Sequence, residues 1–275
     1  MNNQNNEELT TMQNRFMIPQ VMESEFTAAE LAEDMDGLQL HFKQVKIPAG
    51  GALQFEVPTD DPDNPEYMRT IEGVILYNHF SFAYWPENED GENDENSAPQ
   101  CQSMDGKLGI GNPGGLCVNC GYNRFGSRGK AKACKNMRVL YLLRSGEILP
   151  IQISLPPTSL RAFSDFANYA FLLRNRGLCS AVVQIGLKKD TNGKDEYSVA
   201  TFKKLYDFEG EELARIRAYA DQFREQAKVM LSQRASQAEA ASSDVEVGAV
   251  PRNLPGNAEH FSVGMIDGER EPLPA

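Results

Sequence analysis

Four of the five cysteines in this 275-residue chain fall within 34 residues: Cys101, Cys117, Cys120 and Cys134. The stretch around them is polar and rich in glycine, so it cannot build an apolar core of its own and needs another form of stabilisation. Two of the four form a C-x₂-C pair in "GNPGGLCVNCG", where Gly and Pro favour a tight turn. Four thiolates can close a tetrahedral zinc site, so we expect a structural Zn²⁺ in an inserted module at residues 99–137, with His79 as an alternative to Cys101.

Two alternatives remain for these cysteines. A redox C-x₂-C pair normally lies between a strand and a helix, whereas Gly121, Gly126 and Gly129 follow the pair here. The other alternative is a group of reduced cysteines without a metal. Cys179 stands apart and is expected to be a small buried apolar residue.

No enzymatic activity is expected. A shell of four cysteines leaves no open position for a reactive water on the zinc. The chain has three histidines, His41, His79 and His260, and none has an evident acid or nucleophile partner in the sequence.

The chain carries a formal charge of −12, yet residues 106–146 contain eight Lys or Arg and no Asp or Glu. A basic segment in an acidic protein suits the phosphate backbone of a nucleic acid, although a solvated loop that balances nearby acidic loops is an alternative. The basic residues expected to bind phosphates are Lys43, Lys46, Arg124, Arg128, Lys130, Lys132, Lys135, Arg138 and Arg144.

Aromatic residues are concentrated in "YNHFSFAYW", residues 77–85. Alternation along a strand would bury some of these rings and leave others exposed, and exposed rings beside a basic groove can stack on unpaired bases. We expect Phe82 to lie in the core. The expected stacking residues are Phe80, Tyr84, Trp85 and Phe125.

Hydrophobic periodicity and turn residues predict the secondary structure. The expected strands are residues 38–47, 53–57, 71–85, 180–189 and 196–206, together with a hairpin in 137–155 that turns at Ser145-Gly146. The expected helices are residues 27–37, a helix that begins at Thr158 or Ser159 and ends before Gly177, and a long helix at 210–234.

This order of elements predicts an α+β, mainly β fold: an OB-fold-like Greek-key barrel that carries the zinc module. A mixed α+β sheet with one covering helix explains the same order. We expect a flexible N-terminus at 1–20, the OB-fold-like domain at 21–208, a C-terminal helix at 209–234 and an acidic disordered tail at 235–275.

The inserted module, the strand and helix order around it and the acidic tail together resemble zinc-containing single-stranded DNA-binding proteins of bacteriophages and mobile elements. The resemblance covers residues 38–205 by layout, with "CQSMDGKLGIGNPGGLCVNCGYNRFGSRGKAKACKN" as the module. It implies an OB-fold with zinc near the binding cleft. The chain departs from the best-known phage example, which has a histidine among its zinc ligands, and its tail ends in "EREPLPA" without a dense run of acids.

The sequence therefore predicts sequence-independent binding of single-stranded DNA in replication or recombination, with possible partner proteins recruited by the acidic tail. The alternatives are an RNA-binding or transcription-linked zinc protein and a phage structural or assembly protein. No apolar run approaches the roughly 20 residues that span a bilayer, and the polar N-terminus lacks the apolar core of a signal peptide. We expect no membrane partner and a location in the bacterial or phage-infected host cytoplasm, where thiols stay reduced.

Overall fold

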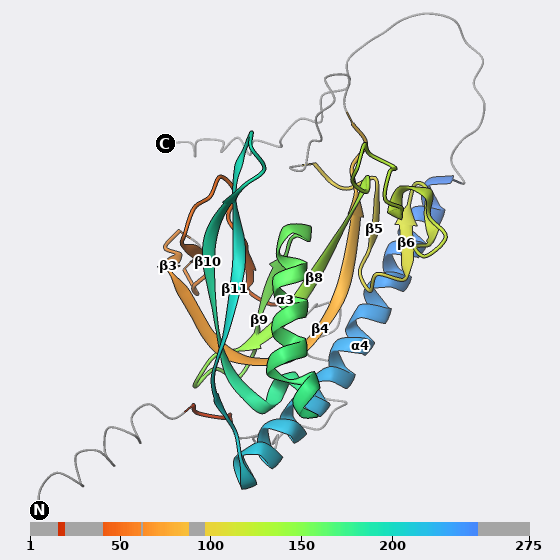
Figure 1. Ribbon diagram of the computed structural model, residues 1–275. Helices are drawn as coiled ribbons and strands as arrows, with labels where there is room; N and C mark the ends of the chain where they lie inside the picture. Colours follow the sequence, from red (N-terminus) through yellow and green to blue (C-terminus); the bar gives the residue numbers. More distant parts are fainter. Residues whose placement is uncertain (1–15, 20–40, 62, 88–96, 247–275) are drawn as a thin grey trace, which may run out of the picture.

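The computed structural model describes residues 16–19, 41–61, 63–87 and 97–246. This part of the chain forms a mixed α+β structure made mostly of strands, with one large sheet and two α-helices (Figure 1). The helix expected at 27–37 and residues 247–275 of the expected tail lie outside the described residues.

The described elements follow the chain from β1 to α4. The strands are β1 (Gln44–Lys46), β2 (Phe55–Val57), β3 (Glu66–Met68), β4 (Thr70–Tyr84), β5 (Cys101–Ser103), β6 (Leu108–Gly111), β7 (Gly115–Leu116), β8 (Cys134–Leu143), β9 (Ile151–Leu155), β10 (Ala181–Thr191) and β11 (Glu196–Asp207). The helices are the α-helices α3 (Pro157–Ala170) and α4 (Gly210–Glu246) and the short 3₁₀ turns η1 (Gly121–Asn123), η2 (Leu172–Arg174) and η3 (Leu178–Ser180).

The large sheet has the strand order β1-β9-β8-β4-β5-β6-β7, and β10 joins it through β4 and carries β11 at its outer side. Strand β1 runs parallel to β9, while the other pairs are antiparallel. Strands β2 and β3 pair only with each other. Among the described strands these pairings leave the sheet open, and none of them closes it into a barrel.

Strand β4 gives the sheet its bend because it changes partner along its length. Residues 70–73 pair with β10, whereas the part from Val74 to Tyr84 pairs with β8. Gly73 lies at the change of partner, where a Cβ atom would collide with the backbone oxygen of Leu143 and lie 2.8 Å from Leu142 Cγ. In Figure 1, β4 runs below α3, from the hairpin of β10 and β11 on one side to β5 and β6 on the other; we call this hairpin the β10–β11 arm.

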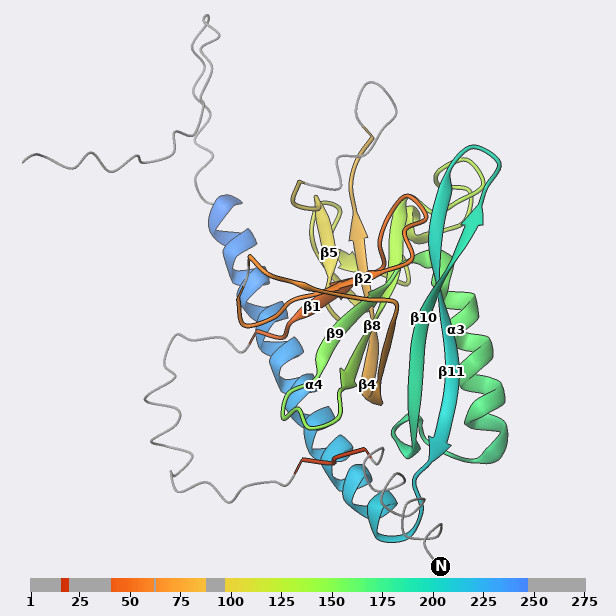
Figure 2. The same ribbon diagram turned by 90° about the vertical axis from the view of Figure 1, so that its left-hand side faces the viewer.

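The two α-helices cover opposite sides of this bent sheet. Helix α3 fills the inside of the bend, where Phe163 packs in one core with Leu140 and Ile185. On the other side, α4 packs its buried residues against a second core that contains Phe42 and Tyr141 (Figure 2). The buried residues of α4 recur every three or four positions, which is the period of an amphipathic helix: Ile216, Ala220, Phe223, Ala227 and Leu231.

Several predicted elements are confirmed. Strands β4, β10 and β11 correspond to the expected strands at 71–85, 180–189 and 196–206. Helix α3 forms where a helix was expected, but its N-cap is Pro156 instead of Thr158 or Ser159, with Pro157 in its first turn, and it ends at Ala170. Helix α4 begins at Gly210 as expected but continues to Glu246, so the first part of the expected tail is helical.

Other predictions made a strand too long or a connection too short. The strand expected at 38–47 is reduced among the described residues to β1, and only Phe55–Val57 of the strand expected at 53–57 forms β2. Ser145 and Gly146 do form a turn, closed by the Glu147 N–H, which donates to the Arg144 carbonyl at 3.2 Å. This turn does not form a two-residue hairpin, because residues 144–150 all lie between β8 and β9. Pro150, which has no N–H to donate, precedes β9, and the Met17 N–H donates to Ser145 Oγ while the Gly146 N–H donates to the Met17 carbonyl.

No α-helix in the described part of the chain is both long enough and apolar enough to cross a membrane.

Candidate metal centre and nucleic-acid interface

The four clustered cysteines come together from two strands and a turn. Tyr84, the last residue of β4, pairs with Cys101 of β5 on one side and with Cys134 of β8 on the other. Cys117 follows β7, and Cys120 precedes η1. The C-x₂-C turn therefore folds back over the end of β4, where the other two cysteines lie.

A small cavity of about 10 Å³ has all four cysteines in its lining, together with Tyr84 and Tyr122. This volume corresponds to roughly one water-sized sphere. Gly109 also lines it, and a Cβ atom at this position would lie 3.0 Å from Cys101 Sγ and 3.7 Å from Cys117 Sγ. The absence of a side chain at Gly109 therefore keeps space beside two of the sulfurs.

The thiols lie close enough to affect one another's ionisation. Burial raises the pKa of Cys134 to about 12, and the charges of Cys120, Cys117 and Cys101 act in the same direction. Burial is also the main cause of the raised pKa of Cys101 and of Cys117. Four thiolates in this space would repel one another, and a bound cation would offset that repulsion.

The donor set fits zinc, although the side chains are not arranged as a finished metal site. Within the ranges described above, no group of three or more His, Cys, Asp or Glu side chains is already placed to hold a metal ion. A zinc ion would have to draw the sulfurs together to Zn–S distances of about 2.3 Å. Four cysteines around one ion-sized cavity are nevertheless the donor chemistry of a structural zinc site.

His79 does not line this cavity. Its ring lies on the α4 side of the sheet beside Tyr77 and Tyr141, with centroid separations of 5.8 and 5.7 Å. Nδ1 is 2.9 Å from the Phe80 carbonyl oxygen, and Nε2 is 3.4 Å from the Tyr141 hydroxyl. Of the two alternative ligands, the structure places Cys101 with the other cysteines and His79 away from them.

The aromatic residues of β4 divide between the two faces of the sheet, with a register irregularity between Ile75 and Tyr77. Tyr77 stacks on Tyr141 on the α4 side. Phe82 is buried, which confirms the expectation that it belongs to the core, and Phe80 is 40% exposed beside it. Tyr84 stacks on Tyr122 at 4.3 Å, and this contact joins β4 to the turn after the C-x₂-C pair.

Three of the expected nucleic-acid-binding aromatics each lie next to a cation. The guanidinium of Arg138 is 4.5 Å from the centroid of the Phe80 ring. The ammonium groups of Lys135 and Lys132 lie 6.0 Å and 5.2 Å from the ring centroids of Trp85 and Phe125, respectively. These three pairs extend along one end of the sheet, from β4 and β8 onto residues 121–133.

Of the remaining expected cations, some are exposed and others form ion pairs with carboxylates. Arg124 and Lys130 are exposed in the loop after η1, and Arg128 there forms an ion pair with Glu87. Lys46 is exposed on β1, and Lys43 just before it binds Asp60 at 2.7 Å.

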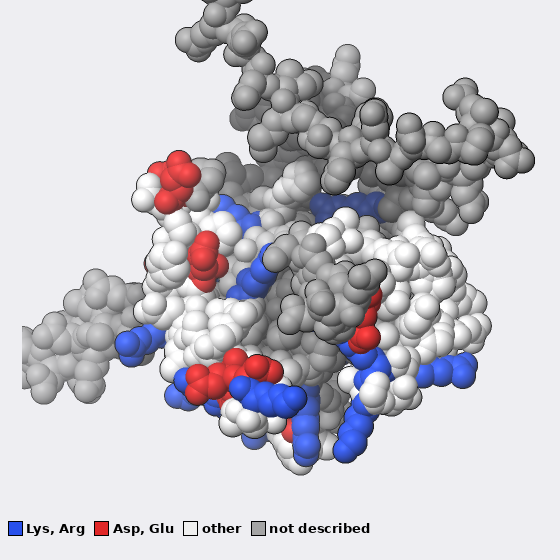
Figure 3. Space-filling view, turned by 90° about the horizontal axis from the view of Figure 1, so that it is seen from above, with Lys and Arg blue, Asp and Glu red and all other residues white. Residues whose placement is uncertain are grey.

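Arg144 lies away from this region. It follows the end of β8 opposite to Cys134 and faces Glu66 and Glu147 at 3.8 and 3.9 Å. Viewed from above, Lys and Arg side chains are spread over the surface with acidic side chains among them (Figure 3). Arg144 therefore lies apart from the expected cations near Cys134.

The sequence analysis missed Tyr122 and Asn123, both next to the C-x₂-C pair. The Asn123 amide donates to the Cys117 carbonyl at 2.9 Å, and its oxygen accepts from Lys132 at 3.1 Å. Their position two and three residues after Cys120 was the only signal in the sequence.

Comparison with known proteins identified no matching family model, no similar curated protein and no similar solved structure.

Proposed function

We propose that this chain binds single-stranded DNA without sequence preference and has no catalytic activity. The observation that carries the proposal is the set of three cation–aromatic pairs, Phe80 with Arg138, Trp85 with Lys135 and Phe125 with Lys132. A ring can stack on a base while the neighbouring cation contacts the phosphate, and such contacts depend little on base identity.

The exposed fractions of these rings suit stacking. Phe125 is 81% exposed in a loop and Phe80 is 40% exposed on β4, so both can be covered by a ligand. Trp85 is partly buried and is held by a hydrogen bond of 2.9 Å from its indole N–H to the Ser97 carbonyl. A ring already held in place loses less conformational entropy when a base stacks on it.

We propose that Zn²⁺ is bound by Cys101, Cys117, Cys120 and Cys134 and has a structural role. The metal would tie the turn at 117–120 to the ends of β5 and β8, and so hold Arg124, Phe125 and Lys132 beside β4. When bound, zinc supplies a positive charge that stabilises the thiolates.

The rest of the proposal rests on the resemblance. It places the protein in DNA replication or recombination in a bacterial or phage-infected cell, in the cytoplasm, where thiols stay reduced and can bind metal. The sheet is bent, and α3 follows β9 and precedes β10 in the chain, which supports the proposal of an OB-fold-like origin. The barrel would then be an open one among the described strands. Recruitment of partner proteins by the acidic C-terminal residues belongs to the same proposal.

Titration with oligo-dT, a duplex of equal length and oligo-U tests this function, with the fluorescence of the single tryptophan, Trp85, as the signal. We expect oligo-dT to quench the fluorescence, and added salt to weaken the binding through counterion release. A preference for oligo-U would favour the RNA-binding alternative. A wild-type protein that binds none of the three at low salt with zinc present would contradict the proposal and favour an assembly role.

A further inference from the structure

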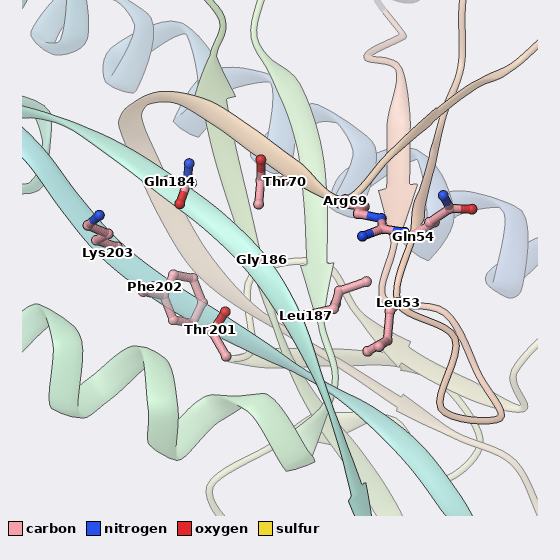
Figure 4. A pocket seen from close by; sticks show the side chains of 10 residues that line it. All are labelled: Leu53, Gln54, Arg69, Thr70, Gln184, Gly186, Leu187, Thr201, Phe202 and Lys203. Atoms are coloured by element: carbon pink, nitrogen blue, oxygen red, sulfur yellow. The ribbon is translucent and has the colours of Figure 1, made fainter.

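A second groove lies away from the cysteine cavity, between β10, β11, the start of β4 and the segment before β2. It has a volume of about 890 Å³. Figure 4 shows the ten residues that line it: Leu53, Gln54, Arg69, Thr70, Gln184, Gly186, Leu187, Thr201, Phe202 and Lys203. No motif in the sequence connects them, because they come from four separate segments of the chain.

The lining includes two cations and no carboxylate. Arg69 and Lys203 are exposed, and neither forms an ion pair with any of the described carboxylates. Glu72, next to the groove, accepts a hydrogen bond of 2.7 Å from the Gln184 amide. The groove therefore offers two cationic groups that no described carboxylate pairs with.

Strand register places these cations at different points along the groove. Lys203 pairs with Gln184. Thr201 and Thr70 both pair with Gly186, and Arg69 directly precedes Thr70 in the chain. In Figure 4, Lys203 and Gln184 lie at one end, and Arg69 and Gln54 at the other. Two separated cations suit an extended ligand with several negative charges better than a single small anion.

The middle of the groove allows a ligand to come close to the backbone. A Cβ atom on Gly186 would lie 3.0 Å from Thr201 Oγ1 and 3.5 Å from Thr70 Cγ2, so a side chain here would occupy the space between the two threonines. Glycine inside a strand often marks a close approach of this kind. The hydroxyl groups of Thr70 and Thr201 can hydrogen-bond to phosphate or sugar oxygens, while Leu53, which is 48% exposed, offers apolar surface for a base.

We propose that this groove binds a second stretch of the same single-stranded DNA, with one phosphate at Lys203 and another at Arg69. The inference rests on the proposed function and extends it, because the strand would contact both the β4–β8 end of the sheet and the β10–β11 arm. The protein would then cover more nucleotides than the cation–aromatic pairs alone can contact.

The double variant Arg69→Ala/Lys203→Ala tests this inference, and Arg215→Ala/Arg217→Ala is the matched control. The control removes the same charge from exposed positions on α4. Binding of a long oligo-dT is measured over a range of salt concentrations. Each lost phosphate contact on a single strand should reduce the log–log salt slope by about 0.7, so we expect a reduction of about 1.4 in the groove variant and none in the control.

Photo-crosslinking of the wild-type protein to oligonucleotides that carry 5-iododeoxyuridine gives an independent measurement. Crosslinked peptides from 184–187 or 201–203, together with the smaller slope, would support the inference. If the groove variant keeps the wild-type slope, or if both variants lose slope equally, the inference is overturned while the proposed function stands. If the wild-type protein binds no oligo-dT at all, both the inference and the proposed function are overturned.

Discussion

Arg138 and Phe80 are directly opposite each other in the β4–β8 pairing, and the Arg138 guanidinium lies 4.5 Å from the centroid of the Phe80 ring. The same guanidinium is 5.4 Å from the ring centroid of Phe163 on α3, and Nε donates to Asn78 Oδ1 at 2.6 Å. Arg138 is thus held between the exposed Phe80 and the core of the sheet. This arrangement fixes a cation beside an aromatic surface before any ligand binds.

Phe80→Ala should weaken oligo-dT binding by about 1–3 kcal/mol, or roughly 5- to 150-fold in Kd, because one stacking surface is lost. Fluorescence anisotropy of a labelled oligo-dT measures this change. Tyr169→Ala is the control, since Tyr169 is 70% exposed on α3 and lies outside the proposed interface. An equal loss of affinity in both variants would contradict a specific role for Phe80.

Cys120→Ser should lower the zinc content from about one ion per chain, whereas Cys179→Ser should leave it unchanged. Cys179 is buried in the second core with Val182 and Phe208, away from the other four cysteines. Metal analysis after purification in zinc-containing buffer gives the result. Full zinc content in Cys120→Ser would remove this residue from the ligand set.

Gly109→Ala should weaken zinc binding because the new methyl group would crowd Cys101 Sγ at 3.0 Å and the Gly115 carbonyl at 3.4 Å. Competition with a chromogenic chelator measures the zinc affinity. Gly121→Ala is the matched control, since a Cβ atom there has no neighbour within 4 Å among the described residues. Equal zinc affinities in the two variants would show that the space beside Gly109 does not matter for the metal.

Gly73→Ala should destabilise the fold by about 1–3 kcal/mol, because the added methyl group collides with the Leu143 backbone where β4 changes partner. Urea unfolding followed by circular dichroism measures the free energy of unfolding. For Gly177→Ala we expect a much smaller change, since the nearest atom to its Cβ would be Cys179 Sγ at 3.9 Å. A Gly73→Ala variant as stable as the wild type would contradict the close packing at this bend.

His79 should make the protein less stable in mild acid. Burial lowers the pKa of His79 in the folded protein, so the unfolded chain binds the proton more readily. The free energy of unfolding should therefore fall as the pH drops below about 6.5, the usual pKa of an exposed histidine, until it reaches the folded-state pKa. His79→Gln should make the free energy of unfolding depend less on pH in this range, as measured by urea unfolding at several pH values. The same pH dependence in His79→Gln and the wild type would contradict the assignment of this loss of stability to His79.

Local patterns predicted much of the fold. The apolar and β-branched residues of 70–84, 181–191 and 196–207 form strands, and Leu160, Phe163 and Phe166, spaced three residues apart, lie on one face of α3. The cysteine spacing predicted which thiols meet. The short strands β5, β6 and β7 were not predicted, because they are only two to four residues long and β6 and β7 contain glycine, which has little strand preference.

The sequence by itself predicted most of the long strands and helices and the grouping of four cysteines, because these properties depend on neighbouring residues and on residue chemistry. Only the tertiary structure decided that β4 changes partner after Gly73 and pairs with both β10 and β8, that His79 faces away from the cysteines, and that Arg144 lies at the far end of β8. It also brought Arg69 and Lys203 into one groove. These relationships depend on contacts between residues far apart in the chain, and no local pattern records which distant strands will pair.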